Sequence, residues 1–261
     1  MIRVIVNGAM GRMGRTVCDA VMAEEDLQLV AMIDPAFQKE ESRAGLNAAG
    51  IPGFSTLAEC LEQVRADVAV DFTVPDAVFA NVIACLKAEI HCVVGTTGIR
   101  QEQLLKIESQ THTSGVNCLI APNFAIGAVL MMEVSRAIAR HMLSCEIIEL
   151  HHDQKLDAPS GTALRTADLI AQEREAGAPA PAGPEGHAAR GDNHRGIPIH
   201  SVRLPGLVAH QEVIFGGQGQ TLSVRHDSIS RESFMPGVVL AVRRVADLDG
   251  IAVGLEKVME I

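Results

Sequence analysis

Short apolar runs alternate with helical patterns through the first 121 residues of the 261-residue chain. Each run is short and almost continuously apolar, which is typical of strands buried on both faces of a parallel sheet. Helical patterns between the runs supply the crossover connections that parallel strands require. The runs lie at residues 2–7, 27–33, 67–72, 90–94 and 117–121. The sequence therefore predicts an α/β domain whose parallel sheet is covered by helices on both faces.

The first of these strands leads directly into a glycine-rich turn and an amphipathic helix. The turn reads Gly8-Ala9-Met10-Gly11-Arg12-Met13-Gly14, a G-x-x-G-x-x-G spacing in place of the commoner G-x-G-x-x-G. Asp34 ends the second strand, twenty residues after the last of these glycines, where a dinucleotide-binding domain places an acid for the adenosine ribose. Asp34-Pro35 also fits a plain turn. The combination favours a Rossmann-like domain with a pyrophosphate site at a helix N-terminus.

The other predicted strands end in residues suited to the same site. Ligands bind at the carboxyl ends of the strands in sheets of this kind. The residues at those ends are Thr73, Gly95-Thr96-Thr97 and Ala121-Pro122-Asn123-Phe124. We therefore expect them to gather near the glycine-rich turn.

A second informative segment spans residues 146–163 and reads Glu-Ile-Ile-Glu-Leu-His-His-Asp-Gln-Lys-Leu-Asp-Ala-Pro-Ser-Gly-Thr-Ala. An apolar strand over 145–150 precedes His151, His152, Asp153 and Lys155. Ser160-Gly161-Thr162 then begins a helix predicted over 163–175. Imidazoles and an ammonium group beside a helix N-terminus indicate a site that holds a carboxylate and moves a proton.

Two other interpretations of this segment remain open. The His and Lys side chains could be solvated residues at a strand edge, with Ser160 an ordinary helix cap. His151, His152 and Asp153 could also bind a metal. However, adjacent strand residues point to opposite faces, which disfavours a shared ion, so no metal site is predicted.

The rest of the chain predicts a second domain entered through a hinge at Pro122-Asn123. Its expected parts are a helix at 127–141, the strand at 145–150, and strands at 199–204, 208–215 and 221–226, the last two joined by 216–220. Residues 176–198 are expected to form a flexible loop, as a lid, an inter-subunit arm or a plain surface loop. Residues 230–246 are predicted to be helical, interrupted at Pro236-Gly237, and to return to the first domain.

These elements assign residues 1–122 and 231–261 to a dinucleotide-binding domain and residues 123–230 to a substrate-binding and oligomerisation domain. The latter is expected to be a smaller α+β domain with an open mixed sheet of about four strands. One helix cannot cover both faces of such a sheet, so we expect a homo-oligomer that buries sheet against sheet.

Composition excludes several classes of protein. A net charge of −10 with no Trp or Tyr argues against nucleic acid as a partner. The longest apolar run, 124–132, is too short to span a bilayer, and we expect no secretory leader. The cysteines are scattered without a CxxC pair, which favours reduced, buried thiols in a cytoplasmic protein. They are Cys18, Cys60, Cys85, Cys92, Cys118 and Cys145.

Over its whole length the chain resembles the 4-hydroxy-tetrahydrodipicolinate reductase family of the diaminopimelate and lysine pathway. The resemblance rests on the glycine-rich turn, Asp71-Phe72-Thr73, the segments 95–98 and 121–124, and above all residues 146–163. It implies a homotetramer that transfers a hydride from NADH or NADPH to a cyclic, unsaturated dicarboxylate, giving tetrahydrodipicolinate.

The resemblance also implies a role for each matching residue. His151 and Lys155 are the acid/base candidates, with Lys155 favoured as the proton donor. The substrate carboxylates would be held by His152, Lys155, Ser160, Gly161, Thr162 and Arg231. The cofactor would be held by Gly8, Ala9, Met10, Gly11, Arg12, Met13, Asp34, Thr73, Gly95, Thr96, Thr97, Ala121, Pro122, Asn123 and Phe124.

The preferred cofactor is expected to be NADH, with NADPH also accepted. Members of the family that use NADPH readily tend to carry a basic residue directly after the acid, and this chain carries Pro35 there. Asp34 would repel a 2′-phosphate, although Arg12 or Lys39 could compensate.

Three other functions share part of this pattern. An amino-acid dehydrogenase of the homoserine or aspartate type shares the two-domain plan but does not require the His-His-x-x-Lys segment. A nucleotide-sensing regulator would tolerate the loss of Lys155, and a metal-dependent hydrolase would be sensitive to chelators.

Overall fold

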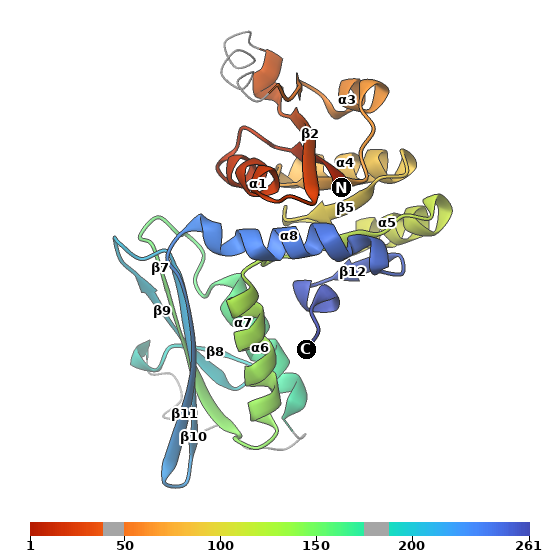
Figure 1. Cartoon of the computed structure of the whole chain (residues 1–261). Coiled ribbons are helices and arrows are strands. Elements are labelled where there is room, and N and C mark those ends of the chain that lie inside the picture. Colours follow the sequence, from red (N-terminus) through yellow and green to blue (C-terminus); the bar gives the residue numbers. More distant parts are fainter. Residues whose placement is uncertain (39–49, 175–187) are drawn as a thin grey trace. The chain divides into compact units, whose positions relative to one another are not determined.

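Figure 1 shows the computed structural model of the chain, which describes residues 1–38, 50–174 and 188–261. Lys39, which was expected to be able to compensate for Asp34, and most of the expected 176–198 loop lie outside these ranges. The chain divides into two compact units. Unit 1 comprises residues 1–124 and 234–261, and unit 2 comprises residues 125–233. No helix in the described ranges is long and apolar enough to cross a membrane.

Unit 1 contains a seven-stranded, wholly parallel sheet in the order β12-β6-β5-β4-β1-β2-β3. Its strands are β1 (Ile2–Asn7), β2 (Leu27–Ile33), β3 (Gly53–Phe54), β4 (Val68–Asp71), β5 (His91–Val94), β6 (Cys118–Ile120) and β12 (Ile251–Val253). The strand order reverses at β1, so the carboxyl ends of β1 and β4 border a crevice at the switch point. The predicted parallel α/β class is confirmed.

Helices cover both faces of this sheet because its strands are apolar on both sides. The helices are α1 (Arg12–Ala23), α3 (Leu57–Gln63), α4 (Pro75–Lys87), α5 (Gln101–Ser114) and α8 (Met235–Arg244), with short 3₁₀ segments η1 (Pro35–Gln38), η5 (Val245–Asp247) and η6 (Leu255–Val258). α1 contacts α8, while α4 contacts α3 and α5. Ile5 packs among buried residues of α4, whereas its neighbours Val4 and Val6 are buried against the opposite layer. Each such aliphatic side chain contributes about 1.5–3 kcal/mol on burial.

Unit 2 is a five-stranded mixed sheet with two helices on one face (Figure 1). It contains α6 (Ile126–Ala139), β7 (Ser144–His151), α7 (Gly161–Glu173), η3 (Ala188–Arg190), β8 (Asp192–His194), β9 (Ile197–Arg203), β10 (Ala209–Gly217), β11 (Gln220–Ser228) and η4 (Arg231–Phe234). The order is β11-β10-β7-β9-β8, with β7 and β9 parallel and the other pairs antiparallel. Ile147, Val213 and Phe215 are fully buried on the helix-covered face.

The expected loop at 176–198 was wrong over its final part, where β8 adds a fifth strand to the sheet. The sequence of β8 is polar, so it carries no apolar alternation to reveal it. Arg195 and Gly196 both have positive φ, 54° and 81°. This is the geometry of the tight turns that join hairpin strands, and it pairs β8 with β9.

At the C-terminal end one expectation was wrong and one strand was missed. Pro236 and Gly237 do not interrupt a helix, because α8 begins at Met235 and the proline occupies its first turn, where no backbone N–H is needed. The strand β12, which pairs with β6, was not expected at all. Its three residues are too few to show a period.

All six cysteines are buried free thiols, as the sequence predicted. Burial raises the pKa of Cys18 and of Cys60 to about 12. Thiols in this state are poor nucleophiles, since the thiolate is the reactive form.

Candidate active site

The glycine-rich turn lies between β1 and α1 in unit 1. Gly8 has φ +78°, and a Cβ there would lie 2.5 Å from the carbonyl oxygen of Phe72. A Cβ on Gly14 would lie 2.0 Å from the carbonyl oxygen of Gly8. Only glycine fits either position without movement of the backbone. Gly11 caps α1, whose first-turn N–H groups have no intrahelical partners and attract anions.

A cavity of about 470 Å³ opens beside this turn, within unit 1. Four of the predicted cofactor residues line it: Gly8, Gly11, Asp34 and Thr73. Its wall also includes Asn7, Ser55, Thr56, Phe72 and Asn81, which the sequence analysis did not include in the site. Thr56 also caps α3, its hydroxyl accepting the Glu59 N–H, 3.3 Å away. The glycine cradle, the helix N-terminus and the acid in the wall fit a dinucleotide.

Asp34 is held in place by the backbone on both sides of it. One carboxylate oxygen accepts the N–H of Met10 in the glycine-rich turn, 3.0 Å away, and the other accepts the N–H of Ala36, 2.9 Å away. Asp34 therefore forms the turn that the sequence allows, and it also fixes the glycine-rich loop. Each oxygen keeps further acceptor capacity for a hydroxyl group.

A second buried acid, Asp71, joins the ends of two neighbouring strands. Its side chain is 3% exposed. It accepts hydrogen bonds from the hydroxyls of Thr73 and Thr96, 2.7 and 2.8 Å away, and from the amide of Asn81, 2.9 Å away. The acid thereby ties the loop after β4 to the loop after β5. Asp71 belongs to the Asp71-Phe72-Thr73 motif on which the family resemblance rests, and no role was expected for it.

Aromatic packing extends this arrangement to the end of β6. The Phe72 and Phe124 rings lie 5.7 Å apart, and a Cβ on Gly95 would meet the Phe72 ring at 2.2 Å. The structure therefore brings Thr73, the loop at 95–97 and Phe124 to one edge of the sheet. The other predicted cofactor residues lie in the turn, in the first turn of α1 or directly after β6: Ala9, Met10, Arg12, Met13, Ala121, Pro122 and Asn123.

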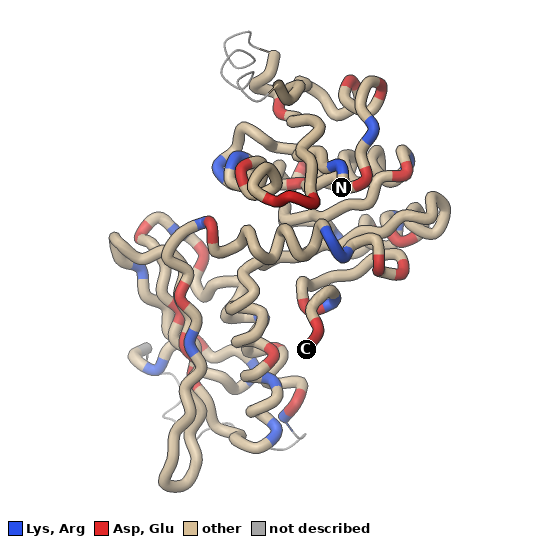
Figure 2. The backbone as a smooth tube through the Cα atoms, viewed as in Figure 1, with Lys and Arg blue, Asp and Glu red and all other residues tan. Residues whose placement is uncertain are grey.

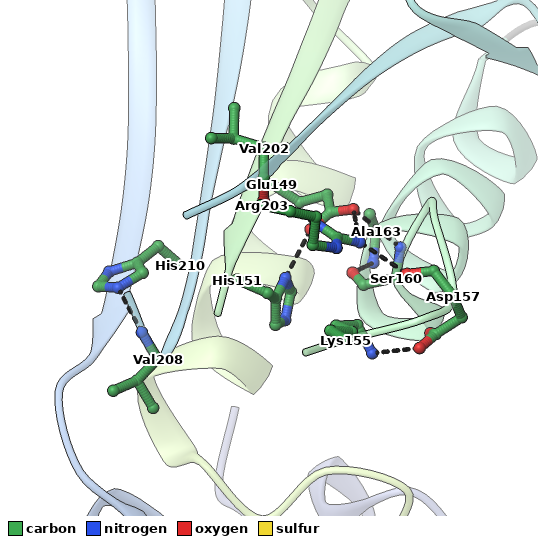
Figure 3. A network of polar contacts seen from close by, with 10 residues as sticks. All are labelled: Glu149, His151, Lys155, Asp157, Ser160, Ala163, Val202, Arg203, Val208 and His210. Atoms are coloured by element: carbon green, nitrogen blue, oxygen red, sulfur yellow. Dashed lines mark hydrogen bonds and ion pairs between the residues drawn. The ribbon is translucent and has the colours of Figure 1, made fainter. Parts of the chain in front are cut away.

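The polar cluster in unit 2 is built at the end of β7, where His151 is the last strand residue (Figure 3). Glu149 lies two residues earlier, on the face that packs against α7, and its side chain is fully buried. Its carboxylate accepts two hydrogen bonds of 2.8 Å from the Arg203 guanidinium and lies 2.5 Å from Nδ1 of His151. Sequence reasoning missed both Glu149 and Arg203.

Glu149 is ionised in this setting. Burial by itself disfavours the charged carboxylate, but hydrogen bonds from His151 and Arg203 outweigh it and hold the pKa of Glu149 at about 2. A buried carboxylate in a bidentate pair with arginine is satisfied on both oxygens. The cluster therefore places an ionised carboxylate, paired with the Arg203 guanidinium, beside the histidine.

Lys155 is paired with the carboxylate of Asp157, for which no role was expected from the sequence. Its Nζ donates to Oδ1 of Asp157 at 2.8 Å, and the lysine side chain is 22% exposed. The hydrogen bond from Lys155 lowers the pKa of Asp157. The surroundings of Lys155 are thus less cationic than the sequence suggested.

The other predicted substrate residues occupy the start of α7 and two exposed positions. Ser160 caps the helix, its hydroxyl accepting the Ala163 N–H at 3.2 Å, so Gly161 and Thr162 form the first turn. His152, directly after β7, and Arg231, at the start of η4, are exposed. Within the described residues, no three His, Cys, Asp or Glu side chains are placed to hold a metal ion.

Two family models match the chain almost end to end. The model for the N-terminal part of dihydrodipicolinate reductase covers residues 2–124, and the model for its C-terminal part covers residues 127–259. The 4-hydroxy-tetrahydrodipicolinate reductase of Listeria innocua is 45% identical over 99% of this chain and 100% of its own. That of Moorella thermoacetica is 45% identical over 99% of this chain and 98% of its own.

Comparison with solved structures leads to the same family. Dihydrodipicolinate reductase from Paenisporosarcina sp. TG-14, with dipicolinate bound, superposes with a TM-score of 0.87 and 41% identity, covering 99% of this chain and 100% of that one. An amine dehydrogenase from Mycobacterium smegmatis, at 14% identity, 96% and 94% coverage and a TM-score of 0.68, shares the fold alone. With both family models and full-length relatives above 40% identity, the chain belongs to the dihydrodipicolinate reductase family.

Proposed function

We propose that this protein reduces 4-hydroxy-tetrahydrodipicolinate to tetrahydrodipicolinate in the diaminopimelate and lysine pathway. The observation that carries the proposal is the cluster at the end of β7 and the start of α7, in a chain whose relatives bear that enzyme's name. The conversion removes the 4-hydroxyl oxygen as water, so one hydride and one proton must enter the ring. The simplest test is NADH oxidation that depends on freshly made product of dihydrodipicolinate synthase.

The nicotinamide nucleotide supplies the hydride, and residues of unit 1 would hold it. The turn from Gly8 to Met13 would bind the pyrophosphate, and Asp34 the adenosine ribose. Residues 95–97 and 121–124, with Thr73, would border the nicotinamide. The cradle that a Cβ on Gly8 would fill supports this assignment.

Residues of unit 2 would bind the dicarboxylate and provide the proton. The N–H groups of Gly161 and Thr162, in the first turn of α7, and the side chains of Ser160, His152 and Arg231 suit the substrate carboxylates. Lys155 would donate the proton that quenches the charge left by hydride addition, with His151 as the second acid/base group. A solved relative that binds dipicolinate, a planar dicarboxylate, supports the substrate class.

We also propose that NADH is preferred and NADPH accepted, because Asp34 and Pro35 border the cavity where a 2′-phosphate would sit. Asp34→Asn is expected to raise kcat/KM for NADPH relative to NADH about tenfold, since a screened like-charge interaction is worth on the order of 1.4 kcal/mol. Initial rates with both nucleotides measure this ratio. Asp19→Asn, on an exposed position of α1, is the matched control. An unchanged ratio in Asp34→Asn would refute the role.

The chain is further proposed to form homotetramers through the sheet of unit 2. The helices cover one face, while Ile148, Leu150 and Ile214 lie half-buried on the other. Residues of both signs of charge lie along β10 and β11 (Figure 2). Among them, Arg225 pairs with Asp227 at 2.9 Å. Light scattering should give about four times the 27.8 kDa of one chain, and Ile148→Lys should lower that mass. A monomeric wild type would contradict the proposal.

A further inference from the structure

The carboxylate of Glu149 is the centre of the cluster in unit 2. Besides the bonds from Arg203 and His151, its Oε1 accepts the backbone N–H of Ser160 at 3.1 Å. One buried acid thus contacts the strand end that carries a candidate acid/base histidine and the cap of α7, whose first turn is proposed to bind a substrate carboxylate.

The charges of the cluster determine where the histidine carries its proton. An ionised carboxylate only accepts hydrogen bonds, and Arg203 donates to both of its oxygens. The 2.5 Å contact between Glu149 Oε2 and His151 Nδ1 therefore requires a hydrogen on Nδ1. Nε2, on the other side of the ring, is then the nitrogen that can exchange a proton.

The same residues fix the segment that joins β7 to α7. Arg203 donates to the carbonyl oxygen of Asp157 at 2.7 Å, while Glu149 holds the N–H of Ser160. Both contacts come from the strands β7 and β9, which pair directly in the sheet. The segment that carries Lys155 is consequently attached to β7 and β9 at its C-terminal end, through Asp157 and Ser160.

We propose that Glu149 is a positioning residue for the reduction, fixing His151 as the Nδ1–H tautomer and fixing the N-terminus of α7 through Ser160. This inference rests on the proposed function for its catalytic part. Glu149 touches neither substrate nor cofactor in this scheme. It acts through His151 and through the helix start.

Nuclear magnetic resonance on protein labelled with ¹⁵N only in the histidine rings tests the tautomer without any turnover. In the wild type, His151 should carry its hydrogen on Nδ1 at the high-pH plateau. In Glu149→Gln the amide oxygen should take the Oε1 position, because the Ser160 N–H and the Arg203 guanidinium there can only donate. The amide NH2 group then faces His151 Nδ1 and donates to it, so His151 should change to the Nε2–H tautomer. Glu149→Asp, which keeps the charge, should retain Nδ1–H. The His151 signal is assigned by its loss in His151→Gln.

Steady-state kinetics then test the catalytic part. Glu149→Gln should lower kcat about 100-fold or more while the Kd for NADH stays within twofold, because loss of a histidine-orienting acid acts on the chemical step. Glu149→Asp should recover part of that loss. Asp168→Asn is the matched control. Asp168 lies on α7, two turns after the helix begins, and it also pairs with a histidine and an arginine, His194 and Arg195. This variant should change neither the His151 signal nor kcat.

Each outcome decides between the claims. An Nε2–H tautomer in the wild type overturns the inference, as does unchanged kcat in a folded Glu149→Gln protein. If Glu149→Gln does not fold, the tautomer of His151 in the wild type still tests the structural claim, and kcat of Glu149→Asp still tests the catalytic claim. If the wild type shows the Nδ1–H tautomer but does not reduce the substrate, the proposed function fails and the structural part of the inference stands.

Discussion

Replacement of Lys155 by alanine is expected to lower kcat by a factor of about 10²–10⁴, the usual contribution of a positioned general acid. Lys155 is held by Asp157 at 2.8 Å beside the start of α7, where the substrate carboxylates are proposed to bind. Without it, the proton must come from water or from His151. Stopped-flow single turnovers, which isolate the chemical step, should show the same loss as steady-state rates.

Binding of the nucleotide should be unaffected, because every proposed cofactor residue lies in unit 1 and Lys155 lies in unit 2. Fluorescence titration of the Lys155→Ala protein should therefore give a Kd for NADH within twofold of the wild type. Lys106→Ala removes the same charge from an exposed position on α5 and should leave both quantities unchanged. Wild-type turnover by Lys155→Ala would exclude the lysine as proton donor.

Gly8→Ala is expected to abolish measurable NADH binding, with a Kd raised at least about 100-fold, and to destabilise unit 1. The added Cβ would lie 2.5 Å from the Phe72 carbonyl oxygen while the backbone sits at φ +78°. Strain of this kind costs about 1–3 kcal/mol before the clash is counted. Because the Phe72 carbonyl belongs to the end of β4, relief of the clash must move the turn or the strand end that borders the cavity.

Gly115→Ala separates crowding from backbone strain. Gly115 ends α5 with φ +72°, nearly the same as Gly8, yet a Cβ there meets nothing within 4 Å. This variant should lose only about 1 kcal/mol of unfolding free energy and keep the wild-type Kd for NADH. Equal binding losses in the two variants would show that the close approach at Gly8 has no special role.

The sequence was a reliable guide to unit 1 because its strands are apolar on both faces and its helices carry ordinary start signals. Thr56 caps α3, and a proline occupies the first position of α4. Prediction failed where elements are short or polar. β8 is three polar residues long, and β12 is three residues long. Such strands are specified by their neighbours in the sheet rather than by a period of their own.

The sequence predicted those site residues that lie together in contiguous motifs, and it did not predict partners that are distant along the chain. The glycine-rich turn, Asp34 and the His-His-x-x-Lys segment are contiguous motifs, and each lies where a strand ends. Arg203 is 54 residues from Glu149, and nothing in its own neighbourhood marks it as a partner. The sequence did hold one unused signal. Glu149 shares a strand face with Cys145 and Ile147, and a charge at a core-facing position requires a buried partner.

In the proposed reaction a hydride passes from a nucleotide held by unit 1 to a dicarboxylate held by unit 2. The most direct measurement uses NADH carrying deuterium at both C4 positions of the nicotinamide, together with fresh synthase product, and analyses the reduced ring by mass spectrometry. We predict tetrahydrodipicolinate that is one mass unit heavier and formed in step with NADH oxidation. Unlabelled product, or NADH oxidation that does not require the substrate, would contradict the account.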